Sequence, residues 1–144
     1  MDENLTLSAF LKENALEIEP VGYVASKRFV DKDKNPVEWE LKPVSNEFMD
    51  KLSNKCIKHV PIKGTRDIKK EFDNVKFMEE LALATVVYPN LNDAELQNSY
   101  GVLGAADLVR AMLTPGEWSD LQFACSEAND YQSGMEDKLV KAKN

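Results

Sequence analysis

Residues 73–89, with the sequence DNVKFMEELALATVVYP, contain the longest apolar stretch of the chain. Asp73 can cap a helix, because its carboxylate can accept hydrogen bonds from the free backbone N–H groups of the first turn. Between Val75 and Tyr88, apolar side chains cover nearly every face of that helix, and Pro89 ends it. A surface helix is apolar on one side only, so this pattern predicts a central, buried helix.

The chain after Pro89 is predicted to form shorter helices. Their expected ranges are 92–99, 104–113, 114–128 and 133 onward. Two of them begin with the pattern of a capping box, in which a cap side chain and a glutamate three residues later satisfy each other's backbone N–H groups. These pairs are Asn92 with Glu95 and Thr114 with Glu117. In the second pair, Thr114 is followed directly by Pro115, a residue favoured at the first helical position.

Before the central helix, the period of the apolar residues changes to two. Apolar and polar side chains alternate over residues 21–30 and 37–43, on both sides of a polar turn. This alternation predicts an antiparallel hairpin with one solvated face. Ser45 can cap a further helix. Residues 59–72 contain proline, glycine and several basic residues without helical periodicity and predict a loop, in which residues 68–72 are a candidate strand.

Together these patterns predict one α+β domain that is mostly helical. A small antiparallel β-hairpin sheet near the N-terminus is followed by a compact group of four to five helices. The expected parts of this single domain, residues 1–144, are an N-terminal helix and connection over 1–20, the β-hairpin over 21–44, a helix over 45–58, a basic loop over 59–72 and the helical part over 73–144.

The charge distribution limits the classes of partner. The 144 residues carry a net charge of −7, with −4 on residues 1–20 and +3 on residues 46–72. An acidic surface repels phosphate, so nucleic acid and anionic membranes are not expected partners. The lysines and arginine of residues 46–72 form a basic run. This run has a single aromatic neighbour, Phe72, and therefore no series of rings on which bases could stack. Its end, with Lys63, Arg66, Lys69 and Lys70, is a candidate electrostatic contact for an acidic protein surface, and the alternative is a solvated face.

The cysteines and the N-terminus favour a cytosolic protein. Cys56 and Cys125 lie on apolar helical stripes and not in a Cys-x-x-Cys spacing, which predicts buried free thiols in a reducing compartment. The N-terminal residues lack a signal-peptide pattern, and no apolar run is long enough for a membrane span.

The residues needed for catalysis or metal binding are sparse. His59 is the one histidine and is expected to be solvated at a helix end. Residues 31–35 resemble the start of a calcium loop, but Pro36 stands where that loop needs glycine. The GXXG spacing at residues 101–104 matches that of nucleic-acid-binding KH loops, but it lies in an acidic segment. Its two glycines are better explained as residues that end and separate helices. We therefore expect a binding module without catalytic residues, metal or cofactor.

Apolar residues near the predicted helix ends are the candidates for a binding groove. They are Tyr88, Leu91, Tyr100, Leu103, Leu113 and Trp118. For any single one, a place in the core is the alternative. An amphipathic helix of a partner could dock into a groove of this kind.

Two motifs resemble those of the XkdN-like family of phage tail assembly chaperones. The first is Tyr-Pro-x-Leu-x-x-x-x-Leu-Gln-x-Ser-Tyr-Gly over residues 88–101, and the second is Leu-x-Pro-Gly-Glu over residues 113–117. The early hairpin, with Ser-Lys-Arg-Phe at 26–29 and Pro-Val-Glu-Trp at 36–39, and the closing residues 142–144 are similar to the same family.

This resemblance implies a non-enzymatic protein of the host bacterial cytoplasm. Such a chaperone binds the tape measure protein, keeps it soluble, helps the tail tube protein to assemble and is absent from the mature tail. Self-association is a further expectation. The alternative is a structural tail or neck component that stays in the virion. Residues 142–144, Ala-Lys-Asn, can be encoded with a slippery heptamer, which makes a frameshifted longer form a candidate partner.

Overall fold

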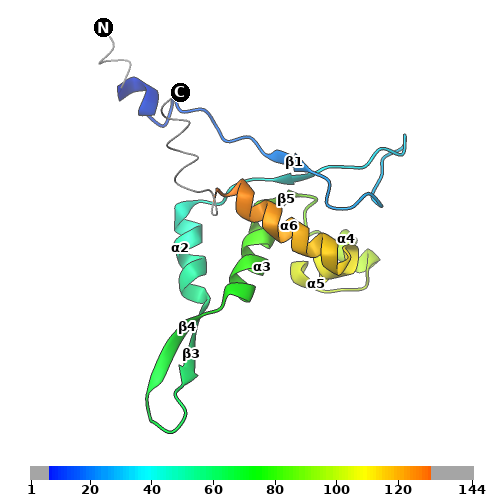
Figure 1. Ribbon diagram of the computed structural model, residues 1–144. Helices are drawn as coiled ribbons and strands as arrows, with labels where there is room; N and C mark the ends of the chain where they lie inside the picture. Colours follow the sequence, from blue (N-terminus) through cyan, green and yellow to red (C-terminus); the bar gives the residue numbers. More distant parts are fainter. Residues whose placement is uncertain (1–6, 131–144) are drawn as a thin grey trace.

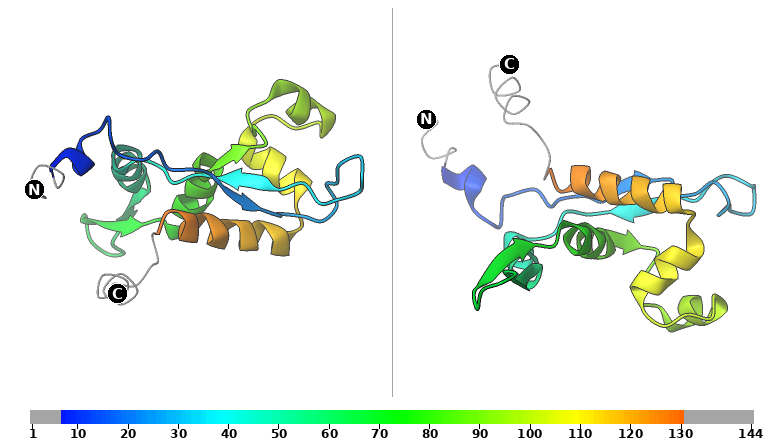
Figure 2. Two further views of the ribbon diagram at one scale, coloured as in Figure 1. Left: turned by 90° about the horizontal axis from the view of Figure 1, so that it is seen from above. Right: turned by 60° about the horizontal axis from the view of Figure 1, so that its bottom comes forward.

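The structure, a computed structural model, describes residues 7–130 (Figure 1). Its elements are β1 (Val21–Tyr23), β2 (Trp39–Leu41), α2 (Asn46–Lys55), β3 (Ile57–Pro61), β4 (Ile68–Phe72), α3 (Asn74–Thr85), β5 (Val86–Tyr88), α4 (Ala94–Ser99), α5 (Ala105–Met112) and α6 (Pro115–Ala128). Helix α6 runs alongside the β1–β2–β5 sheet and packs against α3 (Figure 2). The α+β class predicted from the sequence is confirmed.

The predicted N-terminal hairpin is present with shorter strands. Strands β1 and β2 pair antiparallel, with Val21 opposite Leu41 and Tyr23 opposite Trp39. Trp39 and Leu41 are buried while the residue between them is exposed, so the sheet has one solvated face as expected. In the turn, the Asp31 carboxylate accepts backbone hydrogen bonds from Asp33 and Asn35 at 2.8 and 3.0 Å, which stabilise the predicted polar turn.

The central helix α3 is shorter than predicted. It begins after its Asp73 cap as expected, but it ends at Thr85, and the next three residues form strand β5. Strand β5 pairs with β2 and completes a three-stranded sheet in the order β1-β2-β5. The prediction of helix through Tyr88 was therefore wrong, because the free edge of β2 offers two β-branched valines a strand partner and this tertiary contact outweighs the local apolar pattern.

Residues 57–72 form a β-hairpin and not the loop that we predicted for 59–72. Strand β4 occupies the predicted 68–72, and β3 pairs with it in a continuous antiparallel register. Helix α2 consequently ends at Lys55 and not at residue 58. His59 is exposed, but it lies in a strand and not at a helix end. At the base of the hairpin, the Asp73 N–H group donates a hydrogen bond to the Cys56 carbonyl at 2.7 Å, a nonlocal contact that the sequence period does not indicate.

The other helix starts agree with the sequence to within a residue, apart from those at the chain ends. The Thr114–Glu117 capping box of α6 is confirmed. The cap of α4 is Asp93, whose carboxylate accepts the Leu96 N–H group at 2.9 Å, and not the predicted Asn92. Of the predicted N-terminal helix, residues 7–10 are helical and residues 11–16 are not, while residues 1–6 and the predicted helix from 133 onward lie outside the described residues.

The core has two clusters that meet at α3. The larger one is built around Trp39, Leu108 and Leu121, and the smaller one around Leu52 and Phe77. Both cysteines are buried free thiols, as predicted. Burial raises the pKa of the Cys125 thiol to about 12.

Asn129 connects three segments at the end of α6. Its side-chain oxygen accepts the Val44 N–H group at 2.8 Å, and its amide nitrogen donates to the Thr85 hydroxyl at 2.9 Å and to the Cys125 carbonyl at 2.8 Å. The segment after β2, the end of α3 and the end of α6 are thus held by one side chain.

We predict that Asn129→Ala lowers the free energy of unfolding by about 2 kcal/mol, because it leaves the half-buried Val44 N–H group without its acceptor and removes the hydrogen bond that the buried Thr85 hydroxyl accepts. Equilibrium urea unfolding measures this change. The matched control is Asn54→Ala, at an exposed position of α2, which should change the free energy by less than about 0.5 kcal/mol. Equal losses in the two variants would contradict the role of Asn129.

Candidate functional site

The six apolar candidates divide into exposed and buried residues. Leu91 and Leu113 belong to the core, and Trp118 is half-buried against it. Tyr88, Tyr100 and Leu103 are exposed, with 88% of the Leu103 side chain accessible. Only these three can offer apolar surface to a partner without a change in the core.

Tyr88 lies at the edge of an apolar cleft of about 170 Å³, which we call the Tyr88 cleft. Its lining residues are Phe29, Val37, Trp39, Tyr88, Pro89, Leu96 and Met112. Strand β5 and the segment after it supply one wall, and the two arms of the N-terminal hairpin supply another. Phe29 and Val37 were missed as site residues, although the alternating pattern that predicts the hairpin also places them on its apolar face.

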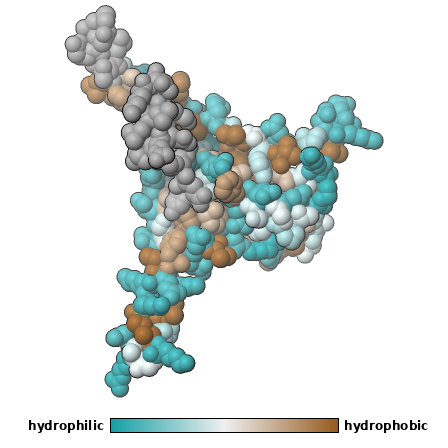
Figure 3. Space-filling model, viewed as in Figure 1, coloured by the Kyte–Doolittle hydropathy of each residue, from teal (hydrophilic) through white to brown (hydrophobic). Residues whose placement is uncertain are grey.

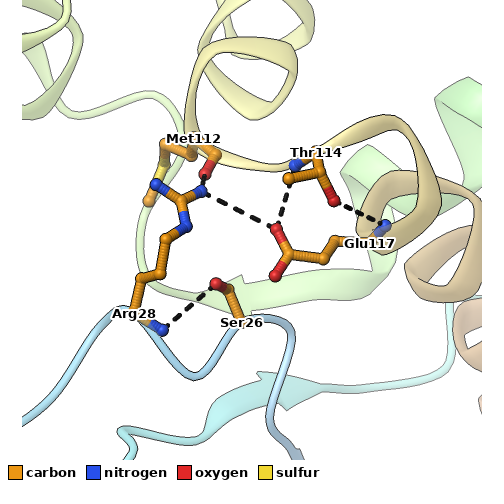
Figure 4. Close-up of polar contacts among 5 residues, drawn as sticks. All are labelled: Ser26, Arg28, Met112, Thr114 and Glu117. Atoms are coloured by element: carbon orange, nitrogen blue, oxygen red, sulfur yellow. Dashed lines mark hydrogen bonds and ion pairs between the residues drawn. The ribbon is translucent and has the colours of Figure 1, made fainter.

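A polar contact fixes the hairpin against the α5–α6 junction beside this cleft (Figure 4). The Arg28 guanidinium donates a hydrogen bond to the Met112 carbonyl and lies 3.7 Å from the Glu117 carboxylate. Glu117 also accepts the Thr114 N–H group at 2.9 Å. The backbone hydrogen bond from Thr114, followed by one from the Ser26 side chain, lowers the pKa of the Glu117 carboxyl. The hairpin wall of the Tyr88 cleft is therefore held to the α5–α6 junction by charge-assisted contacts.

The loop that carries Leu103 is held by a buried amide. The Gln97 side chain donates to the Leu91 carbonyl at 2.9 Å and accepts the Gly104 N–H group at 3.0 Å. Gly101 and Gly104 have φ angles of 66° and 99°, which glycine adopts without strain. The GXXG spacing thus serves a tight connection between α4 and α5, and it presents Leu103 to solvent in a fixed position.

A second, larger groove of about 340 Å³ lies between α2 and α3. Phe48, Leu52, Leu83, Ala84 and Ala105 supply its apolar lining, and Lys51, Lys55, Glu80 and Asn92 complete it. Lys55 donates to the Glu80 carboxylate at 2.6 Å, and this hydrogen bond raises the pKa of Lys55. None of the six predicted residues lines this groove.

The four predicted basic residues all lie on the β3–β4 hairpin. Lys63 and Arg66 are in its turn, and Lys69 and Lys70 are on β4. Lys69 lies 2.9 Å from the Glu71 carboxylate. In the space-filling view, hydrophilic and apolar side chains alternate over this projecting hairpin (Figure 3). The electrostatic candidates are thus grouped in one element, apart from the Tyr88 cleft.

Neither a cluster of metal ligands nor a membrane-spanning helix is found in the described part of the chain. Among residues 7–130, no three histidine, cysteine, aspartate or glutamate side chains are grouped so that they could hold a metal ion. No helix within these residues is long and apolar enough to cross a membrane.

A small α+β chain with an apolar cleft, a rigidly presented leucine and a basic hairpin has the features of a protein-binding module. The model of the phage XkdN-like tail assembly chaperone proteins matches residues 7–143. The chain therefore belongs to this family of tail assembly chaperones.

Relatives from Bacillus subtilis (strain 168) agree with this assignment. The protein YqbN is 32% identical over 139 residues, which cover 96% of this chain and 93% of YqbN. The phage-like element PBSX protein XkdN is 29% identical, with the same coverage. The crystal structure of YqbN has a TM-score of 0.69 and 26% identity, and the match covers 85% of this chain and 93% of that chain.

The lowered pKa of Glu117 predicts how stability depends on pH. The unfolded chain binds a proton at a higher pH than the folded chain, so the contribution of Glu117 is present above the ordinary pKa of 4.5 and is lost as the pH falls through the lowered folded value. Glu117→Gln keeps an oxygen acceptor for the Thr114 N–H group but does not titrate.

We therefore expect the free energy of unfolding to fall less steeply in Glu117→Gln than in the natural chain as the pH is lowered from about 5 to about 3. Urea unfolding at a series of pH values measures both slopes. Above about pH 6, where the carboxylate stays ionised, the two proteins should differ by a constant amount. If the free energies of unfolding of the two proteins ran parallel over the whole pH range, the lowered pKa of Glu117 would be contradicted.

Proposed function

We propose that this chaperone binds the tape measure protein of its tail and keeps it soluble during assembly. Its family membership gives the general role in tail assembly. The observation that supports a direct apolar client is the exposure of Tyr88, Tyr100 and Leu103. Leu103 in particular is held in place by Gln97 and has no apolar cover of its own, which is typical of an anchor for a partner.

The client segment that fits this surface is an amphipathic helix. Its apolar side chains, spaced three and four residues apart, would enter the Tyr88 cleft and contact Leu103. A long helical protein such as the tape measure protein has many such segments, and covering them prevents their aggregation. In this proposal the chaperone acts in the host bacterial cytoplasm without catalysis, leaves when the tail tube protein surrounds the client and is absent from the mature tail.

Co-expression with the tape measure protein of the same phage tests the proposal. The natural chain should raise the soluble fraction of the client and elute with it. The double variant Tyr88→Ser with Leu103→Asp should reduce the co-eluting client about tenfold or more, because both anchors are lost.

The matched control is Val75→Asp, which changes an exposed apolar residue at the opposite end of α3 and should retain the client. Equal recovery with the double variant and the control would contradict the proposed surface. A client that stays insoluble with the natural chain would contradict tape measure binding itself.

Mass spectrometry of purified phage particles tests the proposed departure of the chaperone. The chain should be absent from the particles. Its presence in stoichiometric amounts would favour the alternative, a structural tail or neck component.

The codons of residues 142–144 test the frameshifted longer form. A codon choice without the slippery heptamer would remove the basis for that longer form.

A further inference from the structure

The hairpin β3–β4, residues 57–72, projects from the body of the molecule, and we call it the basic hairpin (Figures 1 and 2). Its base is anchored to the core, since the centroid of the Phe72 ring lies 5.2 Å from the centroid of the buried Phe77 ring. Within residues 7–130, no further strand pairs with either of its outer edges. A two-stranded hairpin is marginally stable in water and is strengthened by a third strand or a covering surface.

The two faces of the basic hairpin differ in character. Ile57, Pro61, Ile68 and Phe72 share one face with two basic side chains, and Ile68 is 63% exposed. The other face carries Lys58, Val60, Lys69 and Glu71. In all, residues 57–72 contain five lysines and arginines against two carboxylates. A strand added here should therefore be apolar on one side and acidic on the other.

Residues 7–20, which we call the N-terminal arm, have this composition. Five of their large apolar side chains are exposed, among them Leu16 at 95% and Ile18 at 60%. Residues 16–19 read Leu-Glu-Ile-Glu, an alternation typical of a strand, although the structure assigns them to no helix or strand. The arm contains three glutamates against one lysine, opposite in sign to the basic hairpin.

The arm and the hairpin of one molecule lie apart. In Figure 1 the arm is at the top and the basic hairpin at the bottom, with α2 between them. The arm is tied to the sheet where β1 begins at Val21. A second copy can bring its arm to the hairpin without disturbing that sheet.

We propose that residues 15–19 of a second copy add as a third, antiparallel or parallel, strand to the β4 edge of the basic hairpin. The β4 edge is favoured over β3, because Pro61 in β3 lacks a backbone N–H group to donate. Leu16 and Ile18 then cover Ile68 and Phe72. Successive side chains of a strand alternate, so Glu17 and Glu19 lie on the opposite face, where the adjacent strand β4 carries Lys69 and Glu71 and the next strand, β3, carries Lys58.

Charge reversal in the full-length chain tests this contact. Sedimentation velocity over a wide concentration range should show the natural chain associating beyond its mass of 16.2 kDa. The arm variant Glu17→Lys with Glu19→Lys, and the hairpin variant Lys58→Glu with Lys69→Glu, should each weaken self-association about tenfold or more, because the arm and this face of the hairpin then carry charge of the same sign. An equimolar mixture of the two variants should associate again, since opposite charges then meet between copies.

The matched control reverses two exposed lysines outside the hairpin, Lys27→Glu with Lys32→Glu, and should associate like the natural chain. Circular dichroism and thermal unfolding of each variant check that the fold is kept. A natural chain that stays monomeric at every concentration overturns the proposal. Self-association that is equally strong in both variants, or a mixture that does not recover, also overturns it. None of these outcomes depends on the tape measure protein, so they are independent of the proposed function.

Discussion

The change from helix to strand at Thr85 is the constraint on which the other parts of the fold depend. Thr85 is fully buried, and its polar groups are used in three directions. Its carbonyl accepts the Lys42 N–H group at 2.9 Å, its hydroxyl donates to the Leu81 carbonyl at 2.7 Å, and the same hydroxyl accepts from Asn129. Buried polar groups without such partners would be costly, so β2, α3 and α6 must meet at this residue. The strand that follows can then only lie beside β2.

The elements that the sequence predicts well are those with local signals. The α6 capping box needs only Thr114 and Glu117, three residues apart, and the structure has it as expected. The N-terminal hairpin is predicted by the alternation of apolar and polar residues. The structure shows the same alternation, because Trp39 and Leu41 are buried. The apolar stretch after Asp73 likewise predicts a central helix, because no other segment could bury so many side chains.

The errors arise where a distant segment decides between two local alternatives. The apolar pattern of α3 continues through Val86 and Val87, and only the unpaired edge of β2 turns these residues into a strand. Strand β3 has no strong pattern of its own and depends on the register with β4. For the candidate site, exposure is equally nonlocal. Leu91 and Leu103 lie in similar apolar settings in the sequence, yet Leu91 is buried and Leu103, in the α4–α5 loop, is exposed.

The exposed apolar side chains are separated from the contacts that hold the core. Leu16 on the arm, Ile68 on the basic hairpin and Leu103 on the α4–α5 loop take no part in either core cluster. Each is accompanied by charged neighbours, and a net charge of −7 keeps molecules with such surfaces apart unless opposite charges are matched. Because burial of these side chains is not needed to fold the chain, their apolar area remains available for association. A chaperone needs this arrangement, since the surface that covers its client must also stay in water when the client is absent.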